Sequence, residues 1–148
     1  MDIKQGLIDA ATEIFPQFGM NALFQGGIQE NQLATANQVN ILIGFSGGLT
    51  GTVVVGFNKI TALKIASSMM KGMDVSTLDV IAWSALGEIT TMIAGNAMAH
   101  MDSEAKINFS PPTIVTGERI FLVISRLKSD KLTFKLDNNL FNISFCLE

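Results

Sequence analysis

The sequence predicts an α+β fold in which helices cover an antiparallel sheet. Three observations support this prediction. Apolar residues recur at helical spacing at the start of the chain. They alternate with other residues over 39–57, on both sides of a glycine-rich turn, as in a β-hairpin. After two further helical segments, the chain ends in alternating strands that short polar turns separate.

The N-terminal segment predicts a first helix over residues 1–24. Pro16 lies late in this helix and is expected to break or kink it, because proline lacks a backbone N–H and crowds the preceding turn. Residues 25–38 are polar, carry Gly26-Gly27 near their start and show no clear period. We therefore expect a loop or an irregular edge strand there.

The segment 39–57 has the clearest strand pattern in the chain. Its first strand alternates up to Phe45, Ser46-Gly47-Gly48 supplies the turn, and the second strand runs from Leu49 to Phe57. Asn58 follows and is expected to cap a helix from residue 59 to about residue 71, which Gly72 would end.

The longest helical pattern runs from Leu78 to Asp102, with Ser76 or Thr77 as the expected cap. Asp79 falls in its first turn, where the helix dipole favours an acid. Downstream, Pro111-Pro112 is expected at the start or edge of a short strand. Three more strands with turn-rich connections predict a C-terminal antiparallel meander; they cover residues 120–127, 131–136 and 140–147.

Composition favours one domain over residues 1–148, with a large core. Hydrophobic residues make up 48% and charged residues 16%, which is compatible with a further apolar surface covered by a second subunit. The net charge of −3 with scattered lysines argues against nucleic acid or acidic membranes as partners. No apolar run approaches the ~20 residues that span a bilayer. The single Cys146 fits the reducing cytoplasm.

A stripe of polar side chains distinguishes the long helix. Ser84, Glu88 and Thr91 fall within a sector roughly 60° wide, beside an apolar stripe that can pack on a core. That apolar stripe comprises Leu78, Ile81, Ala82, Ala85, Ile89, Met92 and Ile93. Small residues at 87, 94 and 95 predict a low surface around Glu88, where a large partner could approach. The simpler alternatives are a solvated Glu88 and a Thr91 hydroxyl bonded to its own helix backbone.

Other polar residues give weaker functional signals. The single His100, with one distant cysteine, makes a zinc site improbable, so no metal ligands are expected in this chain. Asn96 lies on the apolar stripe and is expected to be a buried amide that satisfies backbone groups. The glycines of the hairpin do not lead from a strand into a helix, so they form neither a Rossmann nor a P-loop fingerprint.

The residues from Ser84 to Ala97, SALGEITTMIAGNA, resemble the active helix of the CheX branch of the CheC/CheX/FliY family of CheY-phosphate phosphatases. The family pattern is Ser or Asp, three residues, Glu, two residues, Asn, and in the CheX branch a Gly-Asn pair commonly follows. The segment Ser110 to Gly117, SPPTIVTG, is similar to the family's Pro-and-Gly strand entry. The order of elements also agrees, so the resemblance covers nearly the whole chain.

The resemblance implies a protein aspartyl-phosphate phosphatase that acts on a phosphorylated CheY-type response regulator in chemotaxis. It implies that Glu88 pairs with a lysine of the regulator, that Ser84 and Gly95 lie at the partner-binding surface, and that residue 91 orients the attacking water. The regulator would supply the Mg²⁺ ion, and the phosphatase would carry no cofactor of its own. The family also implies a cytoplasmic homodimer in which strands of two subunits join into one sheet.

The chain departs from the family pattern at one position. Thr91 stands where the family has the catalytic asparagine. The threonine hydroxyl is bonded to Cβ, so it ends about an atom or two short of an asparagine amide. A displacement of about 1 Å can lower a rate about a hundredfold. Three hypotheses follow: a phosphatase weakened at Thr91, a non-catalytic regulator-binding or structural module, and a small-ligand domain that uses the glycine-rich hairpin.

Overall fold

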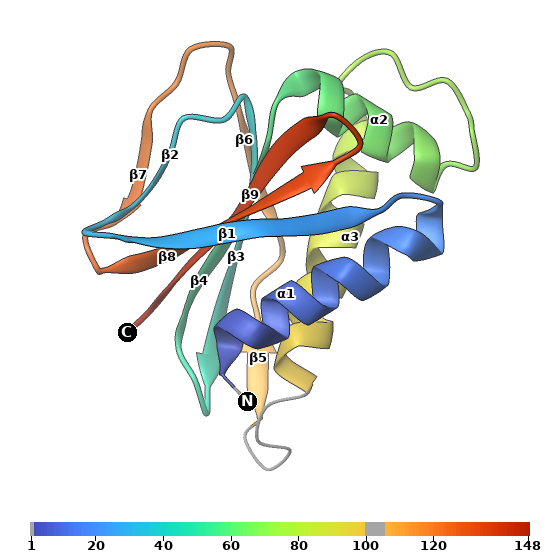
Figure 1. The fold of residues 1–148 in the computed structure, drawn as a ribbon. Helices are drawn as coiled ribbons and strands as arrows, with labels where there is room; N and C mark the ends of the chain where they lie inside the picture. Colours follow the sequence, from blue (N-terminus) through green and yellow to red (C-terminus); the bar gives the residue numbers. More distant parts are fainter. Residues whose placement is uncertain (1, 100–105) are drawn as a thin grey trace.

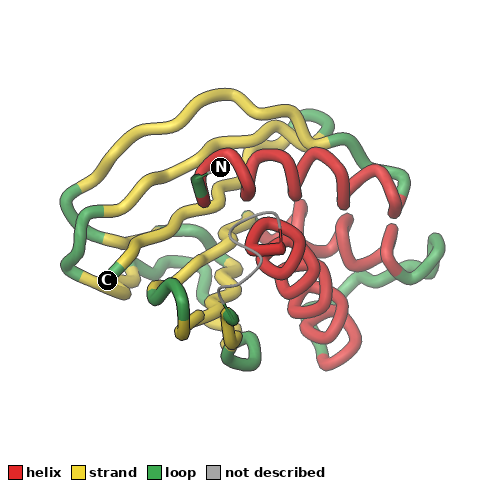
Figure 2. The backbone as a smooth tube through the Cα atoms, turned by 90° about the horizontal axis from the view of Figure 1, so that it is seen from below, coloured by secondary structure: helices red, strands yellow, loops and turns green. Residues whose placement is uncertain are grey.

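The helices of the protein lie together on one face of a twisted sheet (Figures 1 and 2). The structure is a computed structural model that describes residues 2–99 and 106–148. It contains α1 (Ile3–Ile14), the 3₁₀ helix η1 (Phe15–Phe18), α2 (Lys59–Met69) and α3 (Val80–Ala99). This arrangement confirms the predicted α+β class with helices on an antiparallel sheet.

The main sheet has seven strands in the order β1-β8-β9-β4-β3-β5, and β6 also pairs with β3. All of its strand pairings within the described residues are antiparallel. The strands are β1 (Ala22–Glu30), β3 (Val39–Gly47), β4 (Gly51–Phe57), β5 (Ile107–Phe109), β6 (Thr113–Thr116), β8 (Ser129–Leu136) and β9 (Asn139–Leu147). A separate two-stranded sheet pairs β2 (Leu33–Thr35) with β7 (Leu122–Ser125).

The first helix is shorter than predicted. It ends at Ile14 and passes into η1, where Pro16 stands at the start of the tighter helix, as expected for a residue that interrupts α-helical bonding. Gly19 then adopts a left-handed conformation with φ of 78°, and the chain turns back as β1. The predicted helix 1–24 is therefore wrong beyond Phe18.

Strand β1 is the irregular edge strand that was one of the two alternatives for residues 25–38. It pairs with β8 on one side and is terminal in the sheet on the other. Its register shifts between Phe24 and Gly26, which marks a β-bulge with Gly26 at φ of 145°. The bulge and the exposure of most of its residues explain the missing two-residue period.

The central hairpin and α2 match the sequence prediction. Strands β3 and β4 pair from Val39 opposite Phe57 to Phe45 opposite Gly51. The Asn58 side chain accepts a hydrogen bond from the Thr61 backbone N–H at 2.7 Å and so caps α2. Helix α3 differs slightly, because its cap is Asp79, whose carboxylate accepts from the N–H groups of Ile81 and Ala82 at 3.1 and 3.2 Å.

The predicted C-terminal meander is only partly correct. Strands β8 and β9 form a hairpin, but β7 leaves the main sheet and pairs with β2 in an arm over the sheet's other side (Figure 1). Leu33 of this arm is buried with Val54 and Cys146 of the main sheet, so the lone cysteine is a core residue. The expectation that consecutive strands pair failed here because the connection crosses to the sheet's outer side.

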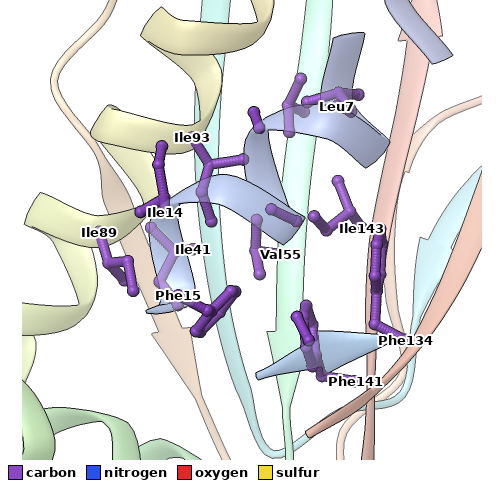
Figure 3. Packing of buried hydrophobic residues seen from close by; sticks show 14 of the residues in the cluster. Leu7, Ile14, Phe15, Ile41, Val55, Ile89, Ile93, Phe134, Phe141 and Ile143 are labelled. Atoms are coloured by element: carbon purple, nitrogen blue, oxygen red, sulfur yellow. The ribbon is translucent and has the colours of Figure 1, made fainter. Parts of the chain in front are cut away.

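The main core lies between the helices and the sheet (Figure 3). Ile89 and Ile93 of α3 pack there with Leu7 of α1 and Phe15 of η1. Phe141 is at the centre of an aromatic group, with ring centroids 5.1 to 5.3 Å from those of Phe15, Phe57 and Phe134. These contacts fix α3 against the rest of the domain, so side chains on its outer face stand on a rigid support.

Candidate functional site

The candidate site is the outer face of α3. Helix α3 is buried on most of its circumference, including Leu86, Ile89, Thr90 and Ile93. Ser84, Glu88 and Thr91 remain exposed, and half-buried Gly95 lies one turn further on, in the same roughly 60° sector. The structure therefore places all four predicted residues on one continuous stripe.

The Glu88 carboxylate is uncommitted. It is exposed, and none of the hydrogen bonds or ion pairs among residues 2–99 and 106–148 involves it. The ion pair found in this part of the chain joins Lys64 of α2 to Asp137 in the β8–β9 turn and lies elsewhere. A carboxylate held on a rigid helix without an internal partner can meet a cation from another molecule.

The Thr91 hydroxyl, by contrast, is already engaged. Its Oγ1 donates to the backbone carbonyl oxygen of Gly87 at 2.8 Å, the helical i to i−4 pattern. This is the simpler alternative that the sequence left open for Thr91. Because the hydroxyl hydrogen is already donated to Gly87, the Thr91 oxygen can only accept a further hydrogen bond. An amide side chain can both donate and accept, so Thr91 retains only the accepting half of that capacity.

Gly95 on the stripe and Gly87 beside it differ in their surroundings. A Cβ built on Gly95 would meet no atom within 4 Å, which agrees with the predicted low surface there. A Cβ built on Gly87 would lie 3.2 Å from Cγ of Pro112, so Gly87 is covered rather than open. Pro112 belongs to a segment tied to the sheet through Ser110, whose Oγ accepts from the Gly44 N–H at 2.9 Å.

Two hollows flank the stripe. One is a shallow groove between the stripe and Pro112, bordered also by Trp83 and Met92. The other has a volume of about 270 Å³ and lies between η1, the end of α2 and α3. Ser84 and Glu88 border both hollows, so a partner that reaches Glu88 also meets apolar surface on each side.

Sequence patterns alone missed the apolar borders of this site. The sequence pattern places Ile81 on the core-facing stripe, but Ile81 is 47% exposed, because it lies beside Glu88 on the outer side of α3. Pro112 was recognised only as a strand-entry residue. Its packing on Gly87 depends on how β6 crosses α3, for which a single sequence gives no local signal.

The remaining polar candidates contribute little to the stripe. Asn96 is half-buried, and its Oδ1 has no hydrogen-bond partner among the described residues, so the expected satisfaction of backbone groups is not seen there. His100 and Asp102 lie outside the described residues. Within the described ranges, no cluster of His, Cys, Asp and Glu could hold a metal ion, and no helix is long and apolar enough to cross a membrane.

The stripe can bind a partner molecule and orient it, but it offers few groups for covalent chemistry. It presents one carboxylate, one hydroxyl that is engaged with the backbone and one serine, with neither a histidine base nor a cysteine nucleophile among its described residues. Such a set suits a reaction whose reactive group and metal ion reside on another molecule.

Comparison with known sequences gives a family match for most of the chain. The family described as chemotaxis phosphatase CheX matches residues 39–135. The CheY-P phosphatase CheX of Thermotoga maritima is 35% identical over 102 residues. The aligned part covers 68% of this chain and 63% of the Thermotoga protein, so it spans less than two thirds of that relative.

Comparison with solved structures identifies the fold. The chemotaxis protein CheX of Desulfovibrio desulfuricans superposes with a TM-score of 0.86 at 21% identity, covering all of both chains. The CheX–CheY–BeF₃–Mg²⁺ complex of Borrelia burgdorferi gives a TM-score of 0.78 at 16% identity, covering 99% of this chain and 98% of the other. The match extends beyond the family-matched segment to include α1, β1 and β9.

Proposed function

Since the chain belongs to the chemotaxis phosphatase CheX family, we propose that it hydrolyses the aspartyl phosphate of a CheY-type response regulator, at a rate lowered by Thr91. The observation that carries this proposal is the uncommitted Glu88 carboxylate on the rigid outer face of α3, at the family's glutamate position. The homologue from Thermotoga maritima bears the name of this activity. The reaction would convert aspartyl phosphate and water into aspartate and inorganic phosphate.

Glu88 would act in docking. Its carboxylate would pair with a lysine beside the regulator's phosphate and so bring α3 against the phosphorylated aspartate. Phosphoryl transfer depends mainly on positioning and on stabilisation of charge, so a correctly placed helix can accelerate it without a covalent intermediate of its own. Ser84 and Gly95 would lie at the same contact, above and below Glu88 on the stripe.

Thr91 would act in placing the attacking water. Its Oγ1 can accept a hydrogen from water, but its own hydrogen is held by Gly87 and its side chain ends close to the helix. An asparagine amide reaches further and can both accept and donate. We therefore expect slower turnover than with asparagine at this position.

The Mg²⁺ ion would come with the regulator. The Borrelia complex contains Mg²⁺ together with CheX and CheY, and the described residues of this chain offer no carboxylate or histidine cluster for it. The reaction would take place in the cytoplasm, with which the buried free Cys146 is compatible.

A homodimer formed through the β1 edge is a further part of the proposal. This nine-residue strand is terminal in the sheet, and Leu23 and Ile28 on it are each 60% exposed. The opposite edge is less suited, because β5 has three residues and Pro111-Pro112 precedes β6. Sedimentation of the wild type as a dimer, and of an Ile28→Lys variant as a monomer, would support this edge; a wild-type monomer would refute it.

The second candidate function is regulator binding without catalysis. The hydrogen bond from Thr91 to Gly87 favours it, since that bond withdraws the hydroxyl hydrogen from the site. Following phosphate release from a phosphorylated CheY-type regulator, with and without this protein, separates the two. Faster release with wild type supports the phosphatase, whereas unchanged release with stable complex formation supports the binding module.

A further inference from the structure

The hollow between η1, α2 and α3 is lined mainly by apolar side chains, so it is suited to receive an apolar side chain from another molecule. Phe18 of η1, Met69 at the end of α2 with Met70 directly after it, and Ile81 of α3 contribute apolar walls. We call this hollow the methionine socket. It shares Ser84 and Glu88 with the candidate site, so it opens directly beside the carboxylate proposed for docking.

The size of the methionine socket argues for one side chain rather than a small-molecule ligand. Its volume is about 270 Å³, below the roughly 300–1,000 Å³ of typical ligand pockets. Among the residues that the structure describes, Ser84 and Glu88 are its only polar lining residues, and no lysine, arginine or histidine of residues 2–99 and 106–148 lines it. It therefore offers nothing to hold a phosphate or another anion.

The surface around the socket is apolar as well. Val80 is 69% exposed at its border, and Met70 and Ile81 are also exposed. Methionine side chains are flexible and polarisable, so they can adapt to an inserted side chain. Apolar surface next to a single charge is typical of an interface core, in which one inserted anchor contributes much of the affinity.

We propose that the methionine socket binds one apolar side chain of the same response regulator whose lysine pairs with Glu88. This inference rests on the proposed function and adds to it a determinant of partner choice. The occupant is inferred from two observations: the socket borders Glu88, so a molecule that reaches Glu88 also meets the socket, and the described lining is apolar apart from Ser84 and Glu88. Regulators with a polar residue at the facing position would bind more weakly, because that residue would lose its water without gaining a partner.

Binding measurements with substituted socket walls test the proposal. The probe is the organism's CheY-type regulator, activated with Mg²⁺ and BeF₃⁻, and the readout is the Kd. Ile81→Gln and Met70→Gln each place an amide in the socket and are expected to weaken binding about tenfold. Ile60→Gln is the matched control, because Ile60 is 72% exposed on α2 and does not line the socket; its Kd should stay within twofold of wild type.

Methyl NMR gives a second readout that does not depend on substitution. With ¹³C-methyl methionine, the signals of Met69 and Met70 should shift when the activated regulator is added. If both glutamine variants bind within twofold of wild type while Glu88→Gln binds more weakly, the socket proposal is overturned and the proposed function stands. If wild type does not bind the activated regulator, both are overturned.

Discussion

Glu88 and Thr91 lie one helical turn apart on the same face of α3, yet they differ in what they already contact. The Glu88 carboxylate has no hydrogen bond or ion pair within the described residues, whereas the Thr91 hydroxyl donates to the Gly87 carbonyl oxygen at 2.8 Å. One side chain is available to a partner and the other is partly occupied by its own helix. Under the proposed function, docking and water placement would therefore be separable tasks, and this chain would be better equipped for docking.

Removing the docking charge is expected to have the largest effect. Glu88→Gln keeps the size of the side chain but loses the attraction to a regulator lysine, so dephosphorylation at low protein concentration should fall about a hundredfold. Glu13→Gln, on the exposed side of α1, is the matched control and should leave the rate unchanged. A fall of less than threefold with Glu88→Gln would show that docking does not depend on this carboxylate.

Placing an amide at position 91, which is proposed to orient the attacking water, should act in the opposite direction. Thr91→Asn removes the bond to Gly87 and extends a donor and acceptor toward the partner, so turnover should rise at least tenfold. Thr12→Asn provides the control, because the Thr12 hydroxyl likewise donates to the carbonyl oxygen of Ile8, at 3.0 Å, but on α1. Equal rates for wild type and Thr91→Asn would mean that residue 91 does not position the water.

Gly95 on the stripe and Gly87 beside it give a smaller, purely structural contrast. Gly95→Ala adds a methyl group into open space and should stabilise the helix by about 0.5–1 kcal/mol, raising Tm by about 1–4 °C. Gly87→Ala should give no such gain, because its Cβ would lie 3.2 Å from the Pro112 ring. Thermal unfolding measures both. Equal stabilisation by the two substitutions would show that Pro112 does not press on α3.

Local sequence patterns predicted those elements whose structure is determined locally. The hairpin of β3 and β4 follows from alternation and a glycine turn, α2 from helical spacing and its Asn58 cap, and the polar stripe from helical geometry alone. In each case the residues that determine the element are close together in the sequence.

Elements that depend on distant contacts were the ones that the sequence did not predict. Strand β1 has no alternation because its bulge interrupts the period, and β7 pairs with β2, some ninety residues earlier, rather than with its neighbour β8. At the site, the exposure of Ile81 and the packing of Pro112 on Gly87 arise where η1, α2 and β6 meet α3. These contacts between elements form only in the assembled fold.

The most direct measurement is the affinity of the wild-type protein for its CheY-type regulator in two states. One sample contains Mg²⁺ and BeF₃⁻, which mimic the phosphorylated form, and the other contains Mg²⁺ alone. If the outer face of α3 docks beside the phosphorylated aspartate, the activated regulator should bind at least tenfold more tightly, a difference of about 1.4 kcal/mol. Equal affinity in the two states, or no binding in either, would contradict the proposed role of Glu88 and its stripe.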